Sequence, residues 1–376
     1  MRILISPDSF KGSLSAPEAA RAIARGLERS GGDFTCEILP LADGGEGSVD
    51  CLLSAVSGEK VIVEVKGPLG RPVSAEYGLL DGGEVAVMEM AAASGLTLLE
   101  EDELDPLQTT TYGTGELICD ALDRGVERIL LGIGGSATND GGMGLARALG
   151  VKFFDESGDE LLGCGASLNR IKSIDTSGLD ERVLRTDIEV ACDVDNPLYG
   201  ERGAARVYAP QKGADEKQVK TLDEGLRNYS SRLEEFLGID ISSLPGAGAA
   251  GGLGGGLRAF LDAELIPGID MIMDYFNYAD LLQEFDLVIS GEGSCDLQSL
   301  QGKVIGGVAE RASAAGVPVV VLAGSIPEKK REKFRERGIT SLFSIVDGPA
   351  DLKSSLEKAP DLLESTAEEI GYLLDI

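Results

Sequence analysis

The chain has 376 residues with 34 Lys plus Arg against 64 Asp plus Glu, and its formal net charge of −30 disfavours nucleic acid and anionic membrane surfaces as partners. Histidine is absent, which excludes Ser-His-Asp and Cys-His catalysis and histidine-ligated metals and leaves proton transfer to carboxylates, lysines or water. The six cysteines form no CxxC pair, and no stretch reaches the roughly 18 apolar residues of a membrane span, so we expect a reduced, cytoplasmic protein.

The amino-terminal region alternates strands and helices. An opening strand leads through a polar turn to a helix, where Ser15 and Glu18 predict a capping box. A second strand is expected over residues 35–39 and a short helix over 47–56. The pattern then changes to an antiparallel meander of three strands, which are Val61 to Val65, Val73 to Leu80 and Val85 to Met90.

Strand and helix alternate again over residues 105–150 and after Asp286. Between them, residues 151–285 are mixed, with a strand near 188–192, a polar helix near 215–237 and a glycine-rich stretch at 246–256. We predict an α/β protein in which a Rossmann-like parallel sheet domain carries an inserted second α/β domain. The expected boundaries are 1–60 with 105–150 and 284–376 for the first, discontinuous domain, and 61–104 with 151–283 for the second.

Five short apolar runs end in turns rich in glycine, serine and aspartate. They occupy residues 2–13, 38–48, 128–142, 287–296 and 319–325. Strands of this kind are typical of a parallel sheet that is covered on both faces, where ligands bind beyond the carboxyl ends of the strands. We therefore expect the five turns to share one crevice.

The turn GIGGSATNDGG, residues 132–142, admits more than one interpretation. GIGGSA matches G-x-G-x-x-A, with Asp155 and Glu156 about twenty residues further on, which suggests a nicotinamide cofactor. The polar insert delays the next helix, however, and this favours a loop whose N–H groups hold phosphates. A plain strand-to-helix connection is the third interpretation. The candidate nucleotide-binding residues are Gly134, Gly135, Ser136, Thr138, Asn139 and Asp140.

GAGAAG, residues 246–251, is a second formal match to the dinucleotide pattern, but no convincing strand precedes it. Its glycines would allow the backbone to approach a ligand or a facing loop closely, and simple packing is the other interpretation.

Glu292 and Asp296 follow a buried apolar run, and Lys303 stands at the head of a helix. Hard oxygen ligands beside a lysine are the parts of a magnesium and phosphate site, whereas the simpler alternative is a capped helix with a solvated ion pair. PDSFKGS offers Asp8, Ser9, Lys11 and Ser13, and ADGGEG offers Asp43 and Glu46. Each motif alone is ordinary turn chemistry, but together they supply carboxylates and one cation, which suit a small hydroxy acid and a metal.

The segment CDVDNPL, within residues 192–198, places Asp193 just after a predicted strand. Asn196 precedes a proline, which restricts its backbone to extended or turn conformations. An aspartate in this position is a candidate general base for a substrate hydroxyl.

Seven motifs occur in this order: PDSFKGSLSA, ADGGEG, GIGGSATNDGG, CDVDNPL, YAPQKGA, GAGAAGGLG and GEG..D.QS..GK. Over essentially the whole chain, this series resembles the type-1 glycerate kinase family. The resemblance implies ATP- and Mg2+-dependent phosphorylation of D-glycerate, usually to 2-phosphoglycerate, on a two-domain α/β fold. The positions that match the family motifs are Asp8, Ser9, Lys11, Asp43, Glu46, Ser136 to Asp140, Asp193, Asn196, Glu292, Asp296 and Lys303.

From the motifs and the resemblance we assign roles as hypotheses. ATP phosphates would rest on the backbone of residues 134–136, with Thr138, Asn139 and Asp140 beside them, and Mg2+ on Glu292, Asp296 and Asp43. The acid would bind near Asp8, Ser9, Lys11, Asn196 and Ser294, and the catalytic residues would be Asp193, Lys11 and Lys303.

One position departs from the family pattern, because Ser294 stands where the family usually has arginine. This change removes a bidentate cation, for which Lys11, Lys303, Lys212 or Arg202 would have to substitute. The alternatives are a kinase that forms 3-phosphoglycerate, a nicotinamide-dependent oxidoreductase using GIGGSA, and a non-catalytic metabolite-binding protein. The oligomeric state is open, with a homodimer as one arrangement.

Overall fold

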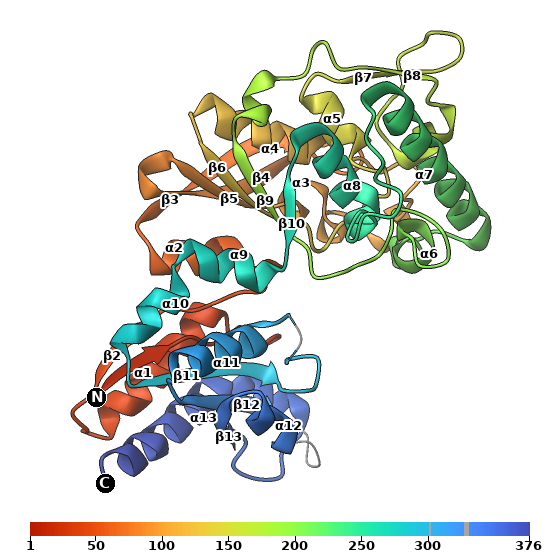
Figure 1. Ribbon diagram of the computed structural model, residues 1–376. Helices are drawn as coiled ribbons and strands as arrows, with labels where there is room; N and C mark the ends of the chain where they lie inside the picture. Colours follow the sequence, from red (N-terminus) through yellow and green to blue (C-terminus); the bar gives the residue numbers. More distant parts are fainter. Residues whose placement is uncertain (301, 327–330) are drawn as a thin grey trace. The chain divides into compact units, whose positions relative to one another are not determined.

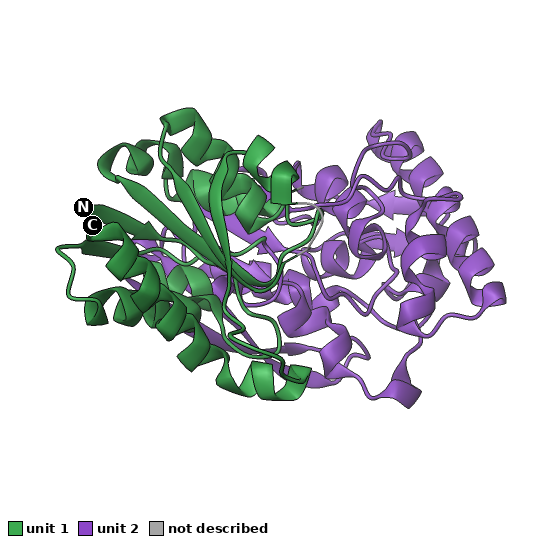
Figure 2. Cartoon of the chain, turned by 90° about the horizontal axis from the view of Figure 1, so that it is seen from below, with its two compact units in different colours: residues 1–43, 50–55, 267–376 green, residues 44–49, 56–266 purple. Residues whose placement is uncertain are grey.

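The structure is a computed structural model that describes residues 1–300, 302–326 and 331–376. The chain divides into two compact units, which Figure 2 draws in different colours. Unit 1 contains residues 1–43, 50–55 and 267–376, and unit 2 contains residues 44–49 and 56–266. Both units are mixed α/β. Within the described ranges, no helix is long and apolar enough to cross a membrane.

Unit 1 is built on a five-stranded sheet in the order β13-β12-β11-β1-β2, in which every neighbouring pair is parallel (Figure 1). The strands are β1 (Arg2–Ile5), β2 (Thr35–Ile38), β11 (Leu287–Ser294), β12 (Val319–Ser325) and β13 (Ile339–Ser344). The helices are α1 (Ala16–Arg29), α2 (Ser48–Ala55, of which residues 50–55 belong to this unit), α9 (Gly268–Tyr275), α10 (Tyr278–Leu281), α11 (Val304–Ala315), α12 (Arg331–Glu336) and α13 (Leu352–Leu374).

Both faces of this sheet are buried. Ile3 and Ile5 pack in one core cluster with α1 and α13, while Leu4 between them is equally buried. From β1 to β2 the chain moves toward one edge of the sheet, and from β11 to β12 it moves toward the other edge. Right-handed crossovers therefore place α1 and α11 on opposite faces of the sheet. The predicted capping box is present, since the side chains of Ser15 and Glu18 bond each other's backbone N–H at the start of α1.

Unit 2 contains a six-stranded sheet in the order β10-β9-β6-β5-β4-β3. The meander of β3, β4 and β5 is antiparallel, as the sequence predicts, whereas β5, β6, β9 and β10 are parallel neighbours. The strands are β3 (Gly58–Lys66), β4 (Pro72–Leu80), β5 (Val85–Glu89), β6 (Arg128–Gly132), β9 (Asp187–Ala191) and β10 (Glu264–Ile266), with a separate hairpin of β7 (Lys152–Phe154) and β8 (Ser173–Asp175).

The helices of unit 2 are α3 (Ala91–Ser94), α4 (Tyr112–Asp123), α5 (Met143–Ala148), α6 (Ala204–Tyr208), α7 (Glu216–Leu237) and α8 (Ala249–Leu261). They share one large hydrophobic core with the sheet. The predicted polar helix is α7, which Asp215 caps through the N–H of Gln218.

The observed boundaries differ from those expected from the sequence. Residues 105–150 belong to unit 2, because β6 pairs with β5 on one side and β9 on the other. Residues 267–283 belong to unit 1, where α9 and α10 contact α11. The apolar run that contains β6 therefore lies in the sheet of unit 2, and not in the first domain with the other four runs as expected.

Candidate functional site

Three predicted carboxylates of unit 1 lie at the carboxyl edge of its sheet. β11, β1 and β2 are parallel neighbours, with Ile5 aligned between Ile289 and Ile38, so their carboxyl ends point to the same edge. The N–H of Asp8 donates to the carbonyl of Gly291 at 2.8 Å, which ties the turn after β1 to β11. Asp8, Asp43 and Glu292 consequently interact electrostatically.

Asp8 carries an unusual carboxyl group. Burial raises its pKa from 3.8 to about 7, against the effect of the Ser9 N–H, which donates to Oδ1 at 2.6 Å. The negative charges of Asp43 and Glu292 raise this pKa further, and Lys11 lowers it. The site therefore concentrates negative charge that a bound cation would stabilise.

Glu292 is buried inside β11, with 7% of its surface exposed, and burial raises its pKa above the usual value. Ser299 and Cys295 hydrogen-bond to its carboxylate, and Lys303 also favours the ionised form. Its Oε1 atom nevertheless has no hydrogen-bond partner among the described residues. An unpaired carboxylate oxygen in such surroundings is a strong acceptor for a ligand.

The other predicted residues of the segment 291–303 lie at the end of β11 or after it. Asp296 is exposed, and its Oδ1 accepts from the N–H groups of Gln298 at 2.7 Å and Ser299 at 3.1 Å, so this oxygen closes a local turn. Lys303 is the N-cap of α11, as predicted, and Ser294 is exposed at the end of β11.

The donor chemistry of this edge fits Mg2+, which prefers oxygen ligands and usually takes one or two carboxylates together with phosphate oxygens and waters. Glu292 and Asp8 supply such oxygens. Within residues 1–300, 302–326 and 331–376, however, no three Cys, Asp or Glu side chains are arranged to hold a metal ion. A magnesium ion at this edge would therefore need further oxygen ligands, such as those of a phosphate group, beside Glu292 and Asp8.

The GIGGSATNDGG turn connects β6 to α5 in unit 2. Gly134 and Gly135 are exposed, and Gly135 adopts a positive φ of 72°, whereas residues 136–140 are buried. α5 begins only at Met143 and has six residues. The helix therefore does not start inside the motif, which disfavours the dinucleotide arrangement in which a helix N-terminus faces a pyrophosphate.

Asp140 holds this turn in place. Its carboxylate is fully buried and accepts hydrogen bonds from the N–H and the hydroxyl of Thr111, both at 2.8 Å, and from the N–H groups of Gly142 and Gly144, both at 3.1 Å. Burial is the largest influence on its pKa and raises it. The structure thus gives the Asp140 side chain a role in shaping the loop.

Lys212, which the sequence suggests only as a substitute for a missing arginine, is a further candidate functional residue. It is 1% exposed, and its Nζ donates to Ser136 Oγ and to the carbonyl of Thr138, both at 2.6 Å. Burial lowers its pKa from 10.5 to about 7, while Asp140 partly restores it. Its motif, YAPQKGA, was recognisable in the sequence, but only the folded chain shows that the ammonium group reaches the loop.

Two side chains beside Lys212 have unpaired polar atoms. Thr138 and Asn139 are both fully buried, and neither the Thr138 hydroxyl nor the two amide atoms of Asn139 has a hydrogen-bond partner within the described part of the chain. Because an unpaired buried polar group costs about 1–3 kcal/mol, these atoms favour a polar ligand or water at the loop.

The glycine-rich segment approaches this loop closely, as the sequence analysis proposed. The N–H of Gly141 donates to the carbonyl of Gly251 at 3.1 Å. A Cβ atom at Gly251 would lie 2.0 Å from the Thr138 carbonyl oxygen, and one at Gly256 would lie 2.3 Å from the Gly141 oxygen. These glycines are needed because backbone packs against backbone.

Asp193 and Asn196 follow β9, the parallel neighbour of β6, so they leave the sheet at the same edge as the GIGGSATNDGG turn. Asp193 is exposed. The Asn196 amide is engaged within unit 2, since it donates to the Arg202 carbonyl at 2.7 Å and accepts from the Tyr208 hydroxyl at 2.6 Å. Arg202 itself pairs with Asp195 at 2.6 Å.

The predicted residues thus form two groups. Unit 1 assembles Asp8, Ser9, Lys11, Asp43, Glu292, Ser294, Asp296 and Lys303 around the ends of β1, β2 and β11. Unit 2 assembles Gly134, Gly135, Ser136, Thr138, Asn139, Asp140, Asp193 and Asn196 at the ends of β6 and β9, together with Lys212. The first group carries carboxylates and lysines, and the second carries a loop with a buried ammonium group.

Comparison with known proteins identifies the family of the chain. A sequence profile of the glycerate kinase family matches residues 3–375. The chain is 49% identical to a glycerate kinase of Halalkalibacterium halodurans, over 99% of this chain and 97% of that protein. It is 44% identical to the glycerate 2-kinase of Escherichia coli, over 100% and 98% of the two chains. A crystal structure from Salmonella typhimurium LT2, provisionally named glycerate kinase 2, matches with a TM-score of 0.91 and 45% identity, over 100% of this chain and 98% of that one. On this similarity, which spans nearly every residue, the chain belongs to the glycerate kinase family.

Proposed function

We propose that this protein transfers the γ-phosphoryl group of ATP to the 2-hydroxyl of D-glycerate, giving 2-phosphoglycerate and ADP. The family membership supports the reaction class and the acid substrate. The name of the Escherichia coli relative, glycerate 2-kinase, supports the position of transfer. The single observation that carries the proposal is the similarity to named glycerate kinases over almost the full chain.

The loop after β6 is the proposed site for the ATP phosphates. The exposed backbone of Gly134 and Gly135 is accessible to phosphate oxygens. Burial lowers the pKa of Lys212 to about 7, and a bound phosphate would favour its charged form behind the loop. The unpaired amide of Asn139 is a further donor. A local cation and local N–H groups are necessary here because the net charge of −30 repels an anionic nucleotide.

The carboxylates of unit 1 are the proposed partners of Mg2+. Glu292 and Asp8 would hold the ion, with Asp43 and Asp296 nearby, and the bound ion would neutralise charge on the transferred phosphoryl group. Lys303 lies at the head of α11 and favours the ionised form of Glu292. Lys11, which is exposed in the turn after β1, is the proposed partner of the substrate carboxylate, with Ser9 and Ser294 as neighbours.

Asp193 is the proposed acceptor of the proton that the substrate hydroxyl loses as its oxygen attacks phosphorus. With no histidine in the chain, a carboxylate is the natural candidate. Since phosphoryl transfer depends mainly on positioning and charge neutralisation, we expect Lys11 and Lys303 to contribute at least as much as this base.

An initial-rate assay of ADP release tests the proposal. ATP and MgCl2 are supplied with D-glycerate, L-glycerate or D-lactate, and Asp193→Asn, Lys11→Met and an exposed control, Lys353→Met, are compared with the wild type. We expect turnover with D-glycerate only, and a fall of about 100-fold or more in kcat for Asp193→Asn. Turnover without acid selectivity would reject the substrate, and wild-type kcat in Asp193→Asn would reject the base.

A further inference from the structure

The carboxyl-terminal helix α13 contains a proline in its interior. Pro360 lies in the middle of this helix, which spans Leu352–Leu374. Because proline has no N–H, the carbonyl of the residue four positions earlier, Leu356, loses its usual helical partner. An unpaired carbonyl inside a helix needs another donor, and its position is therefore a place where a different segment of the chain can attach.

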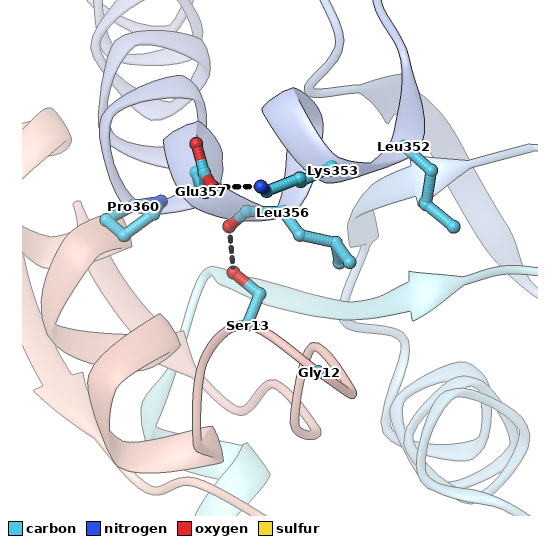
Figure 3. A pocket seen from close by; sticks show the side chains of 7 residues that line it. All are labelled: Gly12, Ser13, Leu352, Lys353, Leu356, Glu357 and Pro360. Atoms are coloured by element: carbon cyan, nitrogen blue, oxygen red, sulfur yellow. Dashed lines mark hydrogen bonds and ion pairs between the residues drawn. The ribbon is translucent and has the colours of Figure 1, made fainter.

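The missing donor comes from the turn that carries Lys11. The hydroxyl of Ser13 donates to the carbonyl of Leu356 at 2.6 Å, as the dashed line in Figure 3 marks. Ser13 and Leu356 are 343 positions apart in the sequence. The hydrogen bond thus joins the first predicted substrate-binding turn to the last helix of unit 1.

The turn itself is short and internally bonded. The N–H of Phe10 donates to Leu14 O, and that of Ser13 to Phe10 O, both at 2.8 Å, so Lys11 and Gly12 form its tip. Phe10 is buried, with 2% of its surface exposed. A Cβ atom at Gly293 of β11 would lie 3.3 Å from the Phe10 Cα, so the base of the turn packs against that strand. Movement of Ser13 would therefore carry Lys11 with it.

Packing and ion pairs hold α13 against the rest of unit 1. Beyond Pro360, α13 buries Leu363, Ala367 and Ile370 among its core-facing residues. Its buried Glu364 binds Arg25 at 2.8 Å and Arg29 at 2.6 Å, which fixes α13 against α1. A group that is attached to this part of α13 is consequently held in place relative to the whole unit.

Between the turn and the helix lies a hollow of about 650 Å3, lined by Gly12, Ser13 and five residues of α13 (Figure 3). The turn is therefore not packed continuously against α13. Loss of the hydrogen bond between Ser13 and Leu356 O should consequently change the position or mobility of the turn.

We propose that Ser13 is a positioning residue: its hydrogen bond to the carbonyl freed by Pro360 holds the Lys11 turn in the geometry that binds the acid substrate. The proposal rests on the proposed function only in assigning Lys11 to that substrate. We call the bond between Ser13 Oγ and Leu356 O the Ser13 latch.

A double-mutant cycle tests the Ser13 latch. Ser13→Ala, Pro360→Ala and the double variant are compared with the wild type, with Ser13→Thr as the conservative variant. Thr366→Ala is the matched control, because it removes a hydroxyl that donates within α13, to Leu362 O at 2.8 Å, and does not touch the turn. In Pro360→Ala the new N–H satisfies Leu356 O, so removing the Ser13 hydroxyl no longer leaves that carbonyl unpaired.

We expect Ser13→Ala to raise KM for D-glycerate about three- to tenfold, with kcat and KM for ATP within about twofold of the wild type. Amide hydrogen exchange over residues 10–14 should become faster, and Ser13→Thr should restore both values. In the Pro360→Ala background, the Ser13→Ala change should lower Tm less than it does in the wild type.

The proposal is overturned if Ser13→Ala keeps wild-type amide exchange over residues 10–14, or if its effect on Tm is equal in both backgrounds. It is also overturned if exchange becomes faster but KM for the acid stays unchanged. Failure of the wild-type enzyme to phosphorylate D-glycerate would instead reject the proposed function. Amide exchange and the Tm cycle would then still decide whether the latch exists, because neither measurement involves the substrate.

Discussion

Asp8 gives the most direct link between the geometry of unit 1 and a measurable free energy. In the folded chain its pKa rises from 3.8 to about 7, chiefly through burial and then through Asp43 and Glu292. The folded state therefore binds more protons than the unfolded state between these values, so the free energy of unfolding falls as pH rises through this range. At about 1.4 kcal/mol per pH unit, the full loss is on the order of 4 kcal/mol above pH 7.

Replacing Asp8 by Asn removes the titrating carboxyl group, so the variant should not lose this free energy of unfolding as pH rises. It also removes a proposed ligand of Mg2+. Between about pH 5 and pH 8, the stability advantage of Asp8→Asn over the wild type should grow by about 3 kcal/mol. Urea unfolding at both pH values, in the presence of a chelator, measures the difference, and Asp361→Asn on the exposed side of α13 is the control. Millimolar MgCl2 should shrink the advantage, because a cation stabilises the ionised form of Asp8. Identical pH profiles for the wild type and Asp8→Asn would refute the reasoning.

Three further variants probe the remaining parts of the site. Lys212→Met should lower kcat/KM at least tenfold. Because the pKa of Lys212 is lowered in the folded chain, the free energy of unfolding of the wild type should rise above pH 7, and this variant should abolish that rise. Urea unfolding at pH 7 and pH 9 checks the second effect. Gly251→Ala should destabilise unit 2 by about 2–4 kcal/mol, because its Cβ would lie 2.0 Å from the Thr138 oxygen at a positive φ of 72°. The control is Gly31→Ala, which has a similar φ of 74° with open space around it, and an equal fall in Tm for both variants would contradict the steric argument. Ser294→Arg should lower KM for the acid substrate by restoring a bidentate cation, whereas unchanged kinetics would place this exposed position outside the site.

Local elements were predictable from the sequence because their signals are local. The Ser15 and Glu18 capping box, the antiparallel meander and the delayed start of α5 follow from residue order and spacing alone. The strand pairing of β6 was not predictable in this way. Its apolar run resembles those of unit 1, and only its contacts with β5 and β9 decide to which sheet it belongs.

The residues of the candidate site also divide into those with a local sequence signal and those that only the fold brings together. Asp8 was identified because polar turns after buried strands are visible in the sequence. Glu292, which was expected just after its strand, lies inside β11 instead. The burial of Lys212 and the hydrogen bond between Ser13 and Leu356 O join segments that are 74 and more positions apart. Pro360 lies inside α13, and the segment that uses the carbonyl it leaves free is defined only by the fold.

The position of phosphoryl transfer tests the central claim most directly. Incubation with ATP, MgCl2 and D-glycerate, followed by phosphorus NMR of the product, distinguishes the two phosphate esters without any assumption about site residues. The account predicts a single new resonance that coincides with added 2-phosphoglycerate. A resonance that coincides with 3-phosphoglycerate would contradict the assigned hydroxyl, and loss of ATP with only inorganic phosphate formed would contradict the assignment of D-glycerate as the acceptor.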